Sequence, residues 1–291
     1  MKGKSGRKLL VGVCAMAIGV SIAVLLVLNM HKKIVNWYEI PVIAHAGGGI
    51  DGKTLTNSLE ALNLASKKGY QMIEIDFSIT SDRELVCYHG WDEDTIDQLE
   101  QEKWYDADDE ANLETFLATP ICRKYTPMTA EDLIDWMKDH KGIYIITDTK
   151  YLKKEDLVFQ FGKLAELCKY DAGLLDRFVI QIYDMEMYET IREVYDFNNI
   201  IYATYVYEDE DIHYWEQVAL DCHKNDIAVV LMSQKYVKEP YVSLLKEYNL
   251  IIYTFTVNSI SRMEKMMEAG ADGVYSDWLT ESDLKYINYD S

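Results

Sequence analysis

Glu74 and Asp76 lie two residues apart in an apolar, β-rich segment, residues 72–78. In a strand, residues i and i+2 point to the same face, so we expect these two carboxylates side by side. Carboxylates held together away from water repel each other, and this repulsion raises a pKa unless a cation neutralises the pair. The spacing therefore predicts a nearby positive charge. A salt-bridge network with Lys150 is one arrangement that would supply it.

The segment that carries these carboxylates is one of eight short apolar runs that alternate with amphipathic helical stretches. The predicted strands are 41–46, 72–78, 143–148, 178–183, 200–206, 227–232, 250–257 and 273–276. The predicted helices are 57–68, 130–140, 155–169, 186–195, 211–224, 236–248 and 259–268. Strands that alternate with helices of this length form parallel βαβ units, and eight units close a barrel. The sequence therefore predicts an α/β fold, a (β/α)8 TIM barrel, over residues 41–291.

One connection is much longer than the others. About sixty residues separate the second and third predicted strands. This connection opens with an extra strand-like run, 84–88, and continues through an acidic, aromatic segment to Pro127. Loops of this length inside a compact domain are usually functional. We therefore predict an insertion in the barrel around residues 84–128.

In barrels of this kind the chemistry lies at the carboxyl ends of the strands. Two imidazoles, three carboxylates and a lysine are predicted to meet at that rim: His45, His89, Glu74, Asp76, Asp148 and Lys150. The other histidines, His31, His140, His213 and His223, are interpreted as packed or surface residues. The convergence of these polar groups on one rim is the central prediction.

The N-terminus carries a candidate membrane anchor. Residues 9–28 form a 20-residue stretch without a charge, the length that crosses a bilayer as a helix. Four basic residues precede it, which places that end in the cytoplasm. We predict a cytoplasmic tail (1–8), a single transmembrane helix (9–30) and a linker (31–40), with the barrel outside the cytoplasm at the cell membrane. A cleaved signal peptide is the alternative interpretation.

The chain is strongly acidic, with 29 Lys and Arg, 49 Asp and Glu, and a formal net charge of −20. The first 33 residues carry six basic and no acidic residues, so the remainder holds 23 basic against 49 acidic residues, or −26. Such a field repels nucleic acid and anionic lipid surfaces, which argues against both as general partners. A phosphate-bearing substrate therefore requires a local positive centre.

The five cysteines give little information. Cys14 lies in the predicted anchor, and the other four are widely spaced without a CxxC pattern. One or two disulfides and unpaired thiols both remain open.

A glycine-rich loop follows the first predicted strand and fits two nucleotide-binding patterns. Residues 47–54 match G-x-x-x-x-G-K-[ST], and Gly47, Gly49 and Gly52 match G-x-G-x-x-G. Both patterns require the helix to begin at the loop, so that its amides meet the phosphate. Here the helix is predicted to start later, with an N-cap at Thr56 or Asn57. We therefore interpret the segment as a flexible rim loop and keep a P-loop nucleotide binder only as the weaker hypothesis.

The ordered set of motifs resembles the glycerophosphodiester phosphodiesterase family over residues 41–280. The matching segments are His45-Ala46-Gly47, Asn57–Ala61, Glu74-Ile75-Asp76, Thr80–Val86 before His89, Asp148-Thr149-Lys150, Thr254–Asn258 and Ala271–Asp277. The resemblance implies a metal-dependent phosphodiesterase on a TIM barrel. It further implies that a neighbouring glycerol hydroxyl attacks phosphorus and that water then opens the cyclic phosphate.

The resemblance also implies a role for each rim residue. His45 and His89 correspond to the acid–base pair of the family. Imidazole suits this role, because it titrates near neutral pH. The implied metal ligands are Glu74, Asp76 and Asp148, and an oxygen-only ligand set favours Mg²⁺ or Ca²⁺ over zinc. The implied substrate-binding residues are Lys150 and Asn258.

Two positions depart from the family pattern. Ala46 stands where the family usually has an arginine that contacts the phosphate, so phosphate binding would depend on Lys150 and the metal. Asp148 replaces a glutamate and is one methylene shorter, which leaves direct and water-mediated coordination both open. These departures motivate an alternative function, a catalytically degenerate membrane-tethered barrel that binds a phosphorylated glycan or polymer. For an active enzyme, the substrate would be a lipid-headgroup glycerophosphodiester or a cell-surface glycerol-phosphate polymer.

Overall fold

The computed structural model describes residues 36–107 and 109–287, and the chain divides into two units, 1–39 and 40–291. The described part of the first unit contains a short 3₁₀ helix, η1 (Trp37–Glu39). The predicted transmembrane helix, 9–30, and most of the predicted linker lie outside the described residues, so the anchor stays a prediction. Within residues 36–107 and 109–287, no helix is long and apolar enough to cross a membrane.

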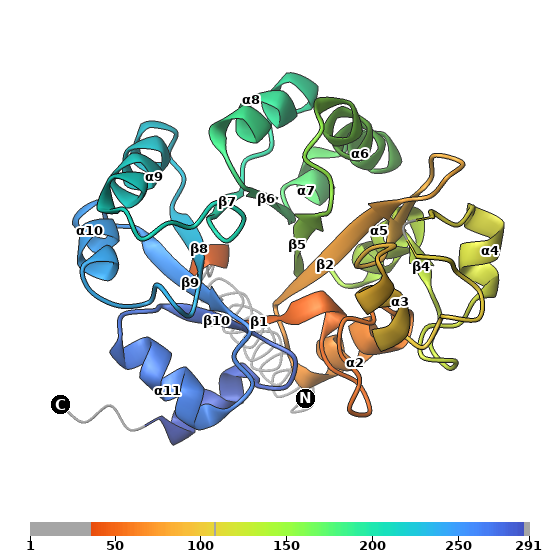
Figure 1. Cartoon of the computed structure of the whole chain (residues 1–291), viewed down its shortest axis with the longest axis horizontal. Helices are drawn as coiled ribbons and strands as arrows, with labels where there is room; N and C mark the ends of the chain where they lie inside the picture. The colour runs from red at the N-terminus through yellow and green to blue at the C-terminus, as the bar shows by residue number, and fades with distance from the viewer. Residues whose placement is uncertain (1–35, 108, 288–291) are drawn as a thin grey trace, which may run out of the picture. The chain divides into compact units, whose positions relative to one another are not determined.

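The second unit is built on a closed barrel of eight parallel strands, as predicted (Figure 1). In spatial order the strands are β1 (Val42–Ala44), β2 (Met72–Ile79), β5 (Tyr144–Thr149), β6 (Phe178–Ile182), β7 (Ile200–Ala203), β8 (Val229–Ser233), β9 (Ile251–Phe255) and β10 (Gly273–Ser276). β1 pairs with both β10 and β2, which closes the ring. Because the strands are parallel, their carboxyl ends share one rim.

Helices surround the strands on the outside of the barrel (Figure 1). They are α2 (Leu59–Lys68), α5 (Ala130–Asp139), α6 (Lys154–Leu167), α7 (Ala172–Leu175), α8 (Met185–Val194), α9 (Ile212–Lys224), α10 (Tyr241–Glu247) and α11 (Ile260–Glu268), followed by a 3₁₀ helix, η3 (Glu281–Tyr286). The prediction of a helix over 236–248 was too long at its start. Pro240 lies at the N-cap of α10, where proline restricts the residue before it and lacks an N–H.

β2 shows why the sequence places carboxylates inside the barrel. All eight of its residues are buried, as expected of a parallel strand covered on both faces. Glu74 and Asp76 are 3% and 2% exposed, on the same face of this strand. The interior of the barrel thus holds two acidic groups that need partners.

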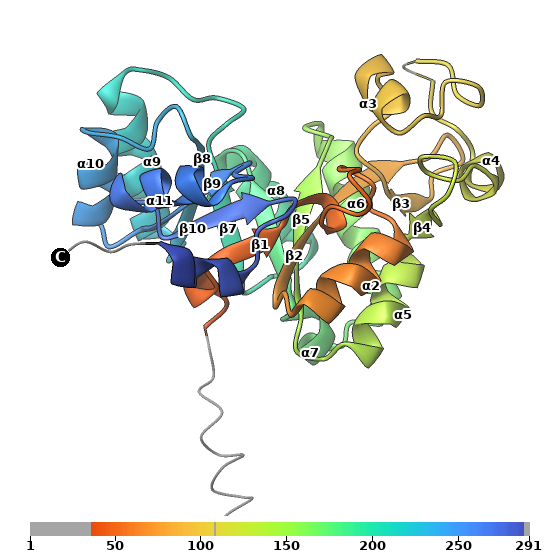
Figure 2. The same cartoon turned by 90° about the horizontal axis from the view of Figure 1, so that it is seen from below.

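The predicted insertion forms an extension of the sheet with two short helices. β3 (Leu85–Cys87) pairs antiparallel with β2, and β4 (Met128–Thr129) pairs antiparallel with β3. Between them lie α3 (Glu93–Gln98) and α4 (Leu113–Ala118), neither of which was predicted from the sequence. Figure 2 shows this part of the chain beside the barrel, next to α2 and α5.

The insertion packs around its own aromatic cluster. Tyr88, Trp91, Tyr105 and Phe116 contact one another, with ring centroids 4.7–6.3 Å apart. Each of these four rings is buried. His89 lies between Tyr88 and Trp91 in the chain, so this cluster fixes the backbone that carries the histidine.

The glycine-rich loop does not have the geometry of a nucleotide-binding loop. The N-cap of α2 is Ser58, whose hydroxyl accepts from the Ala61 N–H, so the predicted caps at Thr56 and Asn57 were wrong. The Asn57 amide is used elsewhere, by Asp76. Because α2 begins five residues after Thr54, its first amides cannot meet a phosphate in the loop. The structure thus argues against both nucleotide hypotheses.

The cysteines of the described residues carry no disulfide. Cys87, Cys122, Cys168 and Cys222 are free and buried. Of the two possibilities that the sequence left open, the structure therefore shows unpaired thiols at these four positions.

The aromatic cluster of the insertion predicts the effect of a core mutation. Phe116→Ala removes a fully buried ring, so we expect a loss of about 3–5 kcal/mol in the free energy of unfolding. Leu117→Ala is the matched control, because Leu117 is adjacent and 44% exposed and should change stability by no more than about 0.5 kcal/mol. Urea denaturation of both variants tests this. Equal effects of the two substitutions would contradict a separate core in the insertion.

Candidate active site

A cavity of about 140 Å³ opens at the rim formed by the carboxyl ends of the strands. Its lining contains both predicted histidines, the three predicted carboxylates and the predicted lysine. The full set is His45, Glu74, Asp76, His89, Asp148, Lys150, Gln181, Tyr205, Leu231, Phe255 and Tyr275. Six of the seven site residues predicted from the sequence therefore share one cavity, and Asn258 is the exception.

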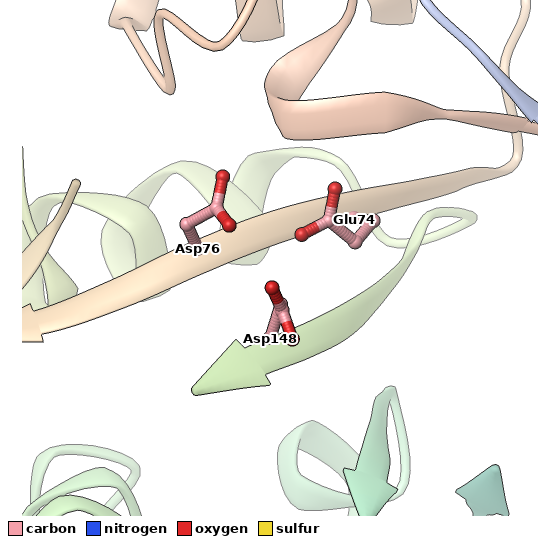
Figure 3. Close-up of side chains that lie close together, drawn as sticks. All are labelled: Glu74, Asp76 and Asp148. Atoms are coloured by element: carbon pink, nitrogen blue, oxygen red, sulfur yellow. The ribbon is translucent and has the colours of Figure 1, made fainter. Parts of the chain in front are cut away.

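Three carboxylates meet inside this cavity. Glu74 and Asp76 come from β2 and Asp148 from β5, and the register of these strands places Asp76 beside Asp148. In Figure 3 the three side chains point toward one another from two neighbouring strands. One oxygen from each lies within 4.8 Å of the other two, the grouping that a metal ion requires. An all-oxygen set of this kind suits Mg²⁺ or Ca²⁺.

Lys150 lies between two of the three carboxylates. Its ammonium is 2.6 Å from Asp76 Oδ1 and 2.5 Å from Asp148 Oδ2. Burial lowers the pKa of Lys150, but the two carboxylates outweigh this effect and raise it well above the ordinary value. The pKa of Asp76 shifts in the opposite direction. Burial raises its pKa, but the charges of Lys150 and His89 and a 2.8 Å hydrogen bond from Asn57 outweigh this and lower it.

Glu74 is the carboxylate that the lysine does not satisfy. Its Oε2 accepts a 2.6 Å hydrogen bond from the Ala46 N–H, whereas its Oε1 is buried with no hydrogen-bond partner. Burial, and then the charge of Asp76, raise the pKa of Glu74 well above its usual range. A buried oxygen without a partner is costly unless something fills the position, and a metal ion would do so.

A divalent cation would relieve the repulsion among these carboxylates. Without one, burial and the charge of Asp76 raise the pKa of Glu74, and a bound cation would favour its ionised form instead. The salt-bridge network that the sequence left open is present, but it involves Asp76 and Asp148 and leaves Glu74 Oε1 without a partner. The oxygens of the triad therefore fit a divalent metal, while the Lys150 ammonium, which has no lone pair to coordinate, would remain a separate positive charge beside it.

The shorter Asp148 is held by several donors. Its Oδ1 accepts hydrogen bonds from Gln181 Nε2 (2.7 Å), from Tyr205 (2.8 Å) and from the Tyr183 hydroxyl. Its Oδ2 faces Lys150. The side chain is thereby fixed through one oxygen while the other lies toward Asp76. None of these three donors was predicted from the sequence, since they come from two other strands and their loops.

His45 is held by a carboxylate. The strand β1 ends at Ala44, and the chain then turns through η2 (His45–Gly47), in which Ala46 takes a left-handed φ of 47°. Nδ1 of His45 lies 2.9 Å from Asp277 Oδ1, and an ionised carboxylate only accepts, so Nδ1 carries the proton. Burial lowers the pKa of His45, but the hydrogen bond to Asp277 and the charges of Glu74, Asp277 and Asp76 outweigh this and raise it to about 9.

Asn258 supports this arrangement from behind. Its Nδ2 donates to Asp277 Oδ2 at 2.6 Å, and its Oδ1 accepts from the Asp277 N–H and the Ser276 hydroxyl. Both amide atoms are thus engaged, and Asn258 does not line the cavity. The predicted contact between Asn258 and substrate stays a prediction. Asp277 follows directly after β10, so the rule that placed the other residues at the rim could have identified it.

His89 is held by a hydroxyl group instead. Its Nδ1 is 2.9 Å from the Thr95 hydroxyl oxygen. Burial lowers the pKa of His89, and this outweighs the opposite effect of the charge of Asp76. The two histidines of the cavity are therefore shifted in opposite directions. At neutral pH one is protonated and the other neutral, as an acid and a base must be.

The structure shows what Ala46 contributes in place of the family's arginine. Ala46 is fully buried, and its backbone N–H rather than its side chain contributes to the site. The cavity lining contains no arginine. Lys150 is the lysine in this lining, so a phosphate group in the cavity would have Lys150 and the metal as its positive partners.

Comparisons with known proteins identify the family of this chain. Residues 48–280 match the model of the glycerophosphoryl diester phosphodiesterase family. The match begins three residues after His45 and includes the other five cavity residues predicted from the sequence. A curated relative, the glycerophosphodiester phosphodiesterase of Bacillus subtilis (strain 168), is 22% identical over 258 residues, which is 82% of this chain and 84% of that protein.

Solved structures show the same fold. A putative glycerophosphodiester phosphodiesterase from Galdieria sulphuraria has a TM-score of 0.68 at 18% identity and covers 88% of this chain and 99% of its own. A phosphodiesterase from Oleispira antarctica, solved with the product sn-glycerol-3-phosphate, has a TM-score of 0.65 at 18% identity, covering 84% and 97% of the two chains.

The raised pKa of His45 predicts how the metal-free protein titrates. We expect His45 to lose its proton near pH 9 in an NMR titration, because Asp277 and the acidic triad stabilise its charge. Asp277→Asn should lower this pKa. Addition of Mg²⁺ or Ca²⁺ should also lower it, since a bound cation neutralises Glu74 and Asp76. The protonated form stabilises the fold fully below pH 6.5, and this stabilisation is lost as the pH rises through about 9.

His213 is the internal control for this titration, because it is exposed on α9 and bonds only to Glu216 and its own helix start. Its resonances should not respond to the metal. A His45 titration curve that neither ion moves would contradict a cation bound beside Glu74 and Asp76.

Proposed function

The chain belongs to the glycerophosphoryl diester phosphodiesterase family, and we propose that its two cavity histidines transfer protons during metal-dependent cleavage of a glycerophosphodiester bond. One observation supports this proposal above the others. Two histidines with opposite pKa shifts line the same small cavity as a carboxylate triad with an unsatisfied oxygen. A cation bound by the triad would give this buried oxygen a partner.

The chain's own residues divide the chemistry between them. His89, neutral at pH 7, would accept the proton of the attacking glycerol hydroxyl, and His45, protonated, would donate to the departing alcohol oxygen. Opening of the resulting cyclic phosphate by water uses the same pair in reverse. The metal, when bound by Glu74, Asp76 and Asp148, polarises the phosphoryl oxygens. Lys150 adds a positive charge at the same place.

The size of the cavity suits a small substrate or a small part of a larger one. A volume of about 140 Å³ is below the range of about 300–1,000 Å³ typical of pockets for drug-sized ligands. A glycerol phosphate unit is of suitable size, and the Oleispira antarctica relative was solved with sn-glycerol-3-phosphate as its product. We propose this unit as the part of the substrate that enters the cavity. The other alcohol would come from a lipid headgroup or from a glycerol-phosphate polymer.

The alternative is a barrel that binds a phosphorylated glycan or polymer without cleaving it. The cavity lining lacks an arginine, which favours this alternative, because phosphate would have one less charged partner. The retained histidine pair favours the enzyme, since binding alone does not need two imidazoles with separated pKa values.

The proposed chemistry predicts the activity of the protein and its variants. The wild-type protein should hydrolyse glycerophosphocholine or bis(p-nitrophenyl) phosphate, lose turnover in EDTA and regain it with Mg²⁺ or Ca²⁺. His45→Ala and His89→Ala should each lower kcat by about 10²–10⁴-fold, the usual contribution of a general acid or base. Lys53→Ala should have no effect, because Lys53 is paired with Glu100 outside the cavity.

The same experiment separates the competing functions. Absence of metal-dependent turnover together with retained binding of glycerol phosphate would favour the binding barrel. Nucleotide binding that depends on Lys53 and is indifferent to His45 would favour the P-loop hypothesis.

We further propose that the barrel is held outside the cytoplasm at the cell membrane by residues 9–30, which are uncharged and apolar and follow a basic tail. The full-length protein should then sediment with membranes, and a chain that lacks residues 1–33 should be recovered in the soluble fraction. Protease added to intact cells whose surface is accessible should digest the barrel. A mature protein that mass spectrometry finds shortened at its N-terminus would instead support a cleaved signal peptide.

A further inference from the structure

A short hydrogen-bonded chain starts at His89 Nδ1 and ends at Asp92. His89 Nδ1 lies 2.9 Å from the Thr95 hydroxyl oxygen, and this hydroxyl lies 2.8 Å from Asp92 Oδ2. The backbone N–H of Thr95 donates to Asp92 Oδ1 at 2.9 Å. Thr95 is 3% exposed, so its hydroxyl is shielded from water, whereas the Asp92 carboxylate at the end of the unit is exposed. The three residues form one local unit at the start of α3.

The protons of this unit can be assigned from its donors and acceptors. The Thr95 hydroxyl has one proton, and the Asp92 carboxylate, being ionised, only accepts. A hydrogen bond to a carboxylate is stronger than one to a neutral nitrogen, so the hydroxyl donates to Asp92. Its lone pairs then face His89, and Nδ1 of His89 must carry the proton. The neutral imidazole therefore has its free lone pair on Nε2.

We infer that Thr95, oriented by Asp92, is a positioning residue that locks His89 in the Nδ1–H tautomer, so that Nε2 is the atom that exchanges protons with the substrate. This inference rests on the proposed function for its consequence, but the tautomer itself is a property of the protein alone. Without the lock, neutral His89 would populate the other tautomer, whose Nε2–H cannot act as a base.

The surrounding structure is arranged to keep this unit in place. Asp92 is the N-cap of α3, so the residue that orients Thr95 is itself fixed by the helix start. Gly90 leaves the necessary space, because a Cβ at this position would lie 2.9 Å from Asp92 Oδ2. The buried rings of Tyr88 and Trp91 hold the backbone on both sides of His89 and Gly90.

The two histidines of the cavity thus have different supports. His45 donates to a carboxylate, Asp277, which favours the charged imidazolium. His89 donates to a hydroxyl, so the nearest charge of its support, on Asp92, lies one hydrogen bond further away, and burial outweighs it. The choice of a threonine here lets His89 be oriented and still remain neutral.

Removal of the hydroxyl tests the lock. Thr95→Val keeps the shape of the side chain but cannot accept from Nδ1. Long-range ¹H–¹⁵N correlation spectra of the full-length protein, with the His89 signals assigned by their loss in His89→Gln, should show the Nε2–H form appear in Thr95→Val and not in the wild-type protein. We expect kcat to fall about 10- to 100-fold, the range for loss of a partner that orients a histidine. KM should change by less than about twofold, and Thr95→Ser should restore both the tautomer and kcat.

A second variant should make the Nε2–H tautomer the main form, rather than allow a mixture of the two. Asp92→Asn retains a good N-cap residue for α3, so the helix start is preserved. Its amide can donate to the Thr95 oxygen, and the threonine proton is then free to donate to His89 Nδ1. We expect predominantly the Nε2–H form and a loss of kcat at least as large as in Thr95→Val.

Thr119→Val is the matched control, because Thr119 is also a buried threonine of the insertion and its hydroxyl donates to the Thr115 carbonyl. It should leave the His89 tautomer and kcat unchanged even if it lowers stability. Equal losses in Thr95→Val and Thr119→Val, or an unchanged Nδ1–H form in Thr95→Val, would overturn the inference. If the wild-type protein shows no turnover, the proposed function fails, and the spectra still decide whether the lock exists.

Discussion

Repulsion among three carboxylates in one buried cavity is the constraint around which the rest of the site is arranged. Charges in a poorly hydrated interior interact strongly, so Glu74, Asp76 and Asp148 can be ionised together only beside positive charge or donors. Lys150 and the donors to Asp148 Oδ1 satisfy two of the three. The third retains one oxygen without a partner, at a position where a cation held by the triad would contact it.

The fold also places the two histidine rings in surroundings that shift their pKa values in opposite directions. His45 follows β1 and is supported by Asp277 after β10, which closure of the barrel brings together from opposite ends of the chain. His89 belongs to the insertion and is supported within its own segment by Thr95. The partner of His45 is a charged carboxylate distant in sequence, and the partner of His89 is a neutral hydroxyl in the same segment. Burial lowers both pKa values; around His45 the hydrogen bond to Asp277 and the nearby carboxylates outweigh it, whereas around His89 burial prevails.

Much of this architecture follows from sequence patterns, and the parts that do not have physical reasons. The period-2 spacing of Glu74 and Asp76 predicted their shared face because strand geometry is local. The predicted barrel already places the ends of its first and last strands side by side, but the hydrogen bond between His45 and Asp277 depends on side-chain conformations that periodicity does not specify. α3 has only six residues, so its helical periodicity is too short to recognise and its stability comes from the cap at Asp92 and from packing.

The aromatic cluster under His89 has a further consequence for the working molecule. The acidic triad lies on barrel strands, whereas one of the two imidazoles lies on the extension. The core under that imidazole contains Ile50 and Ala61 as well as the four rings, so the extension shares it with the segment that follows β1 and with α2. A change in packing on either side of this shared core would therefore move one imidazole relative to the three carboxylates.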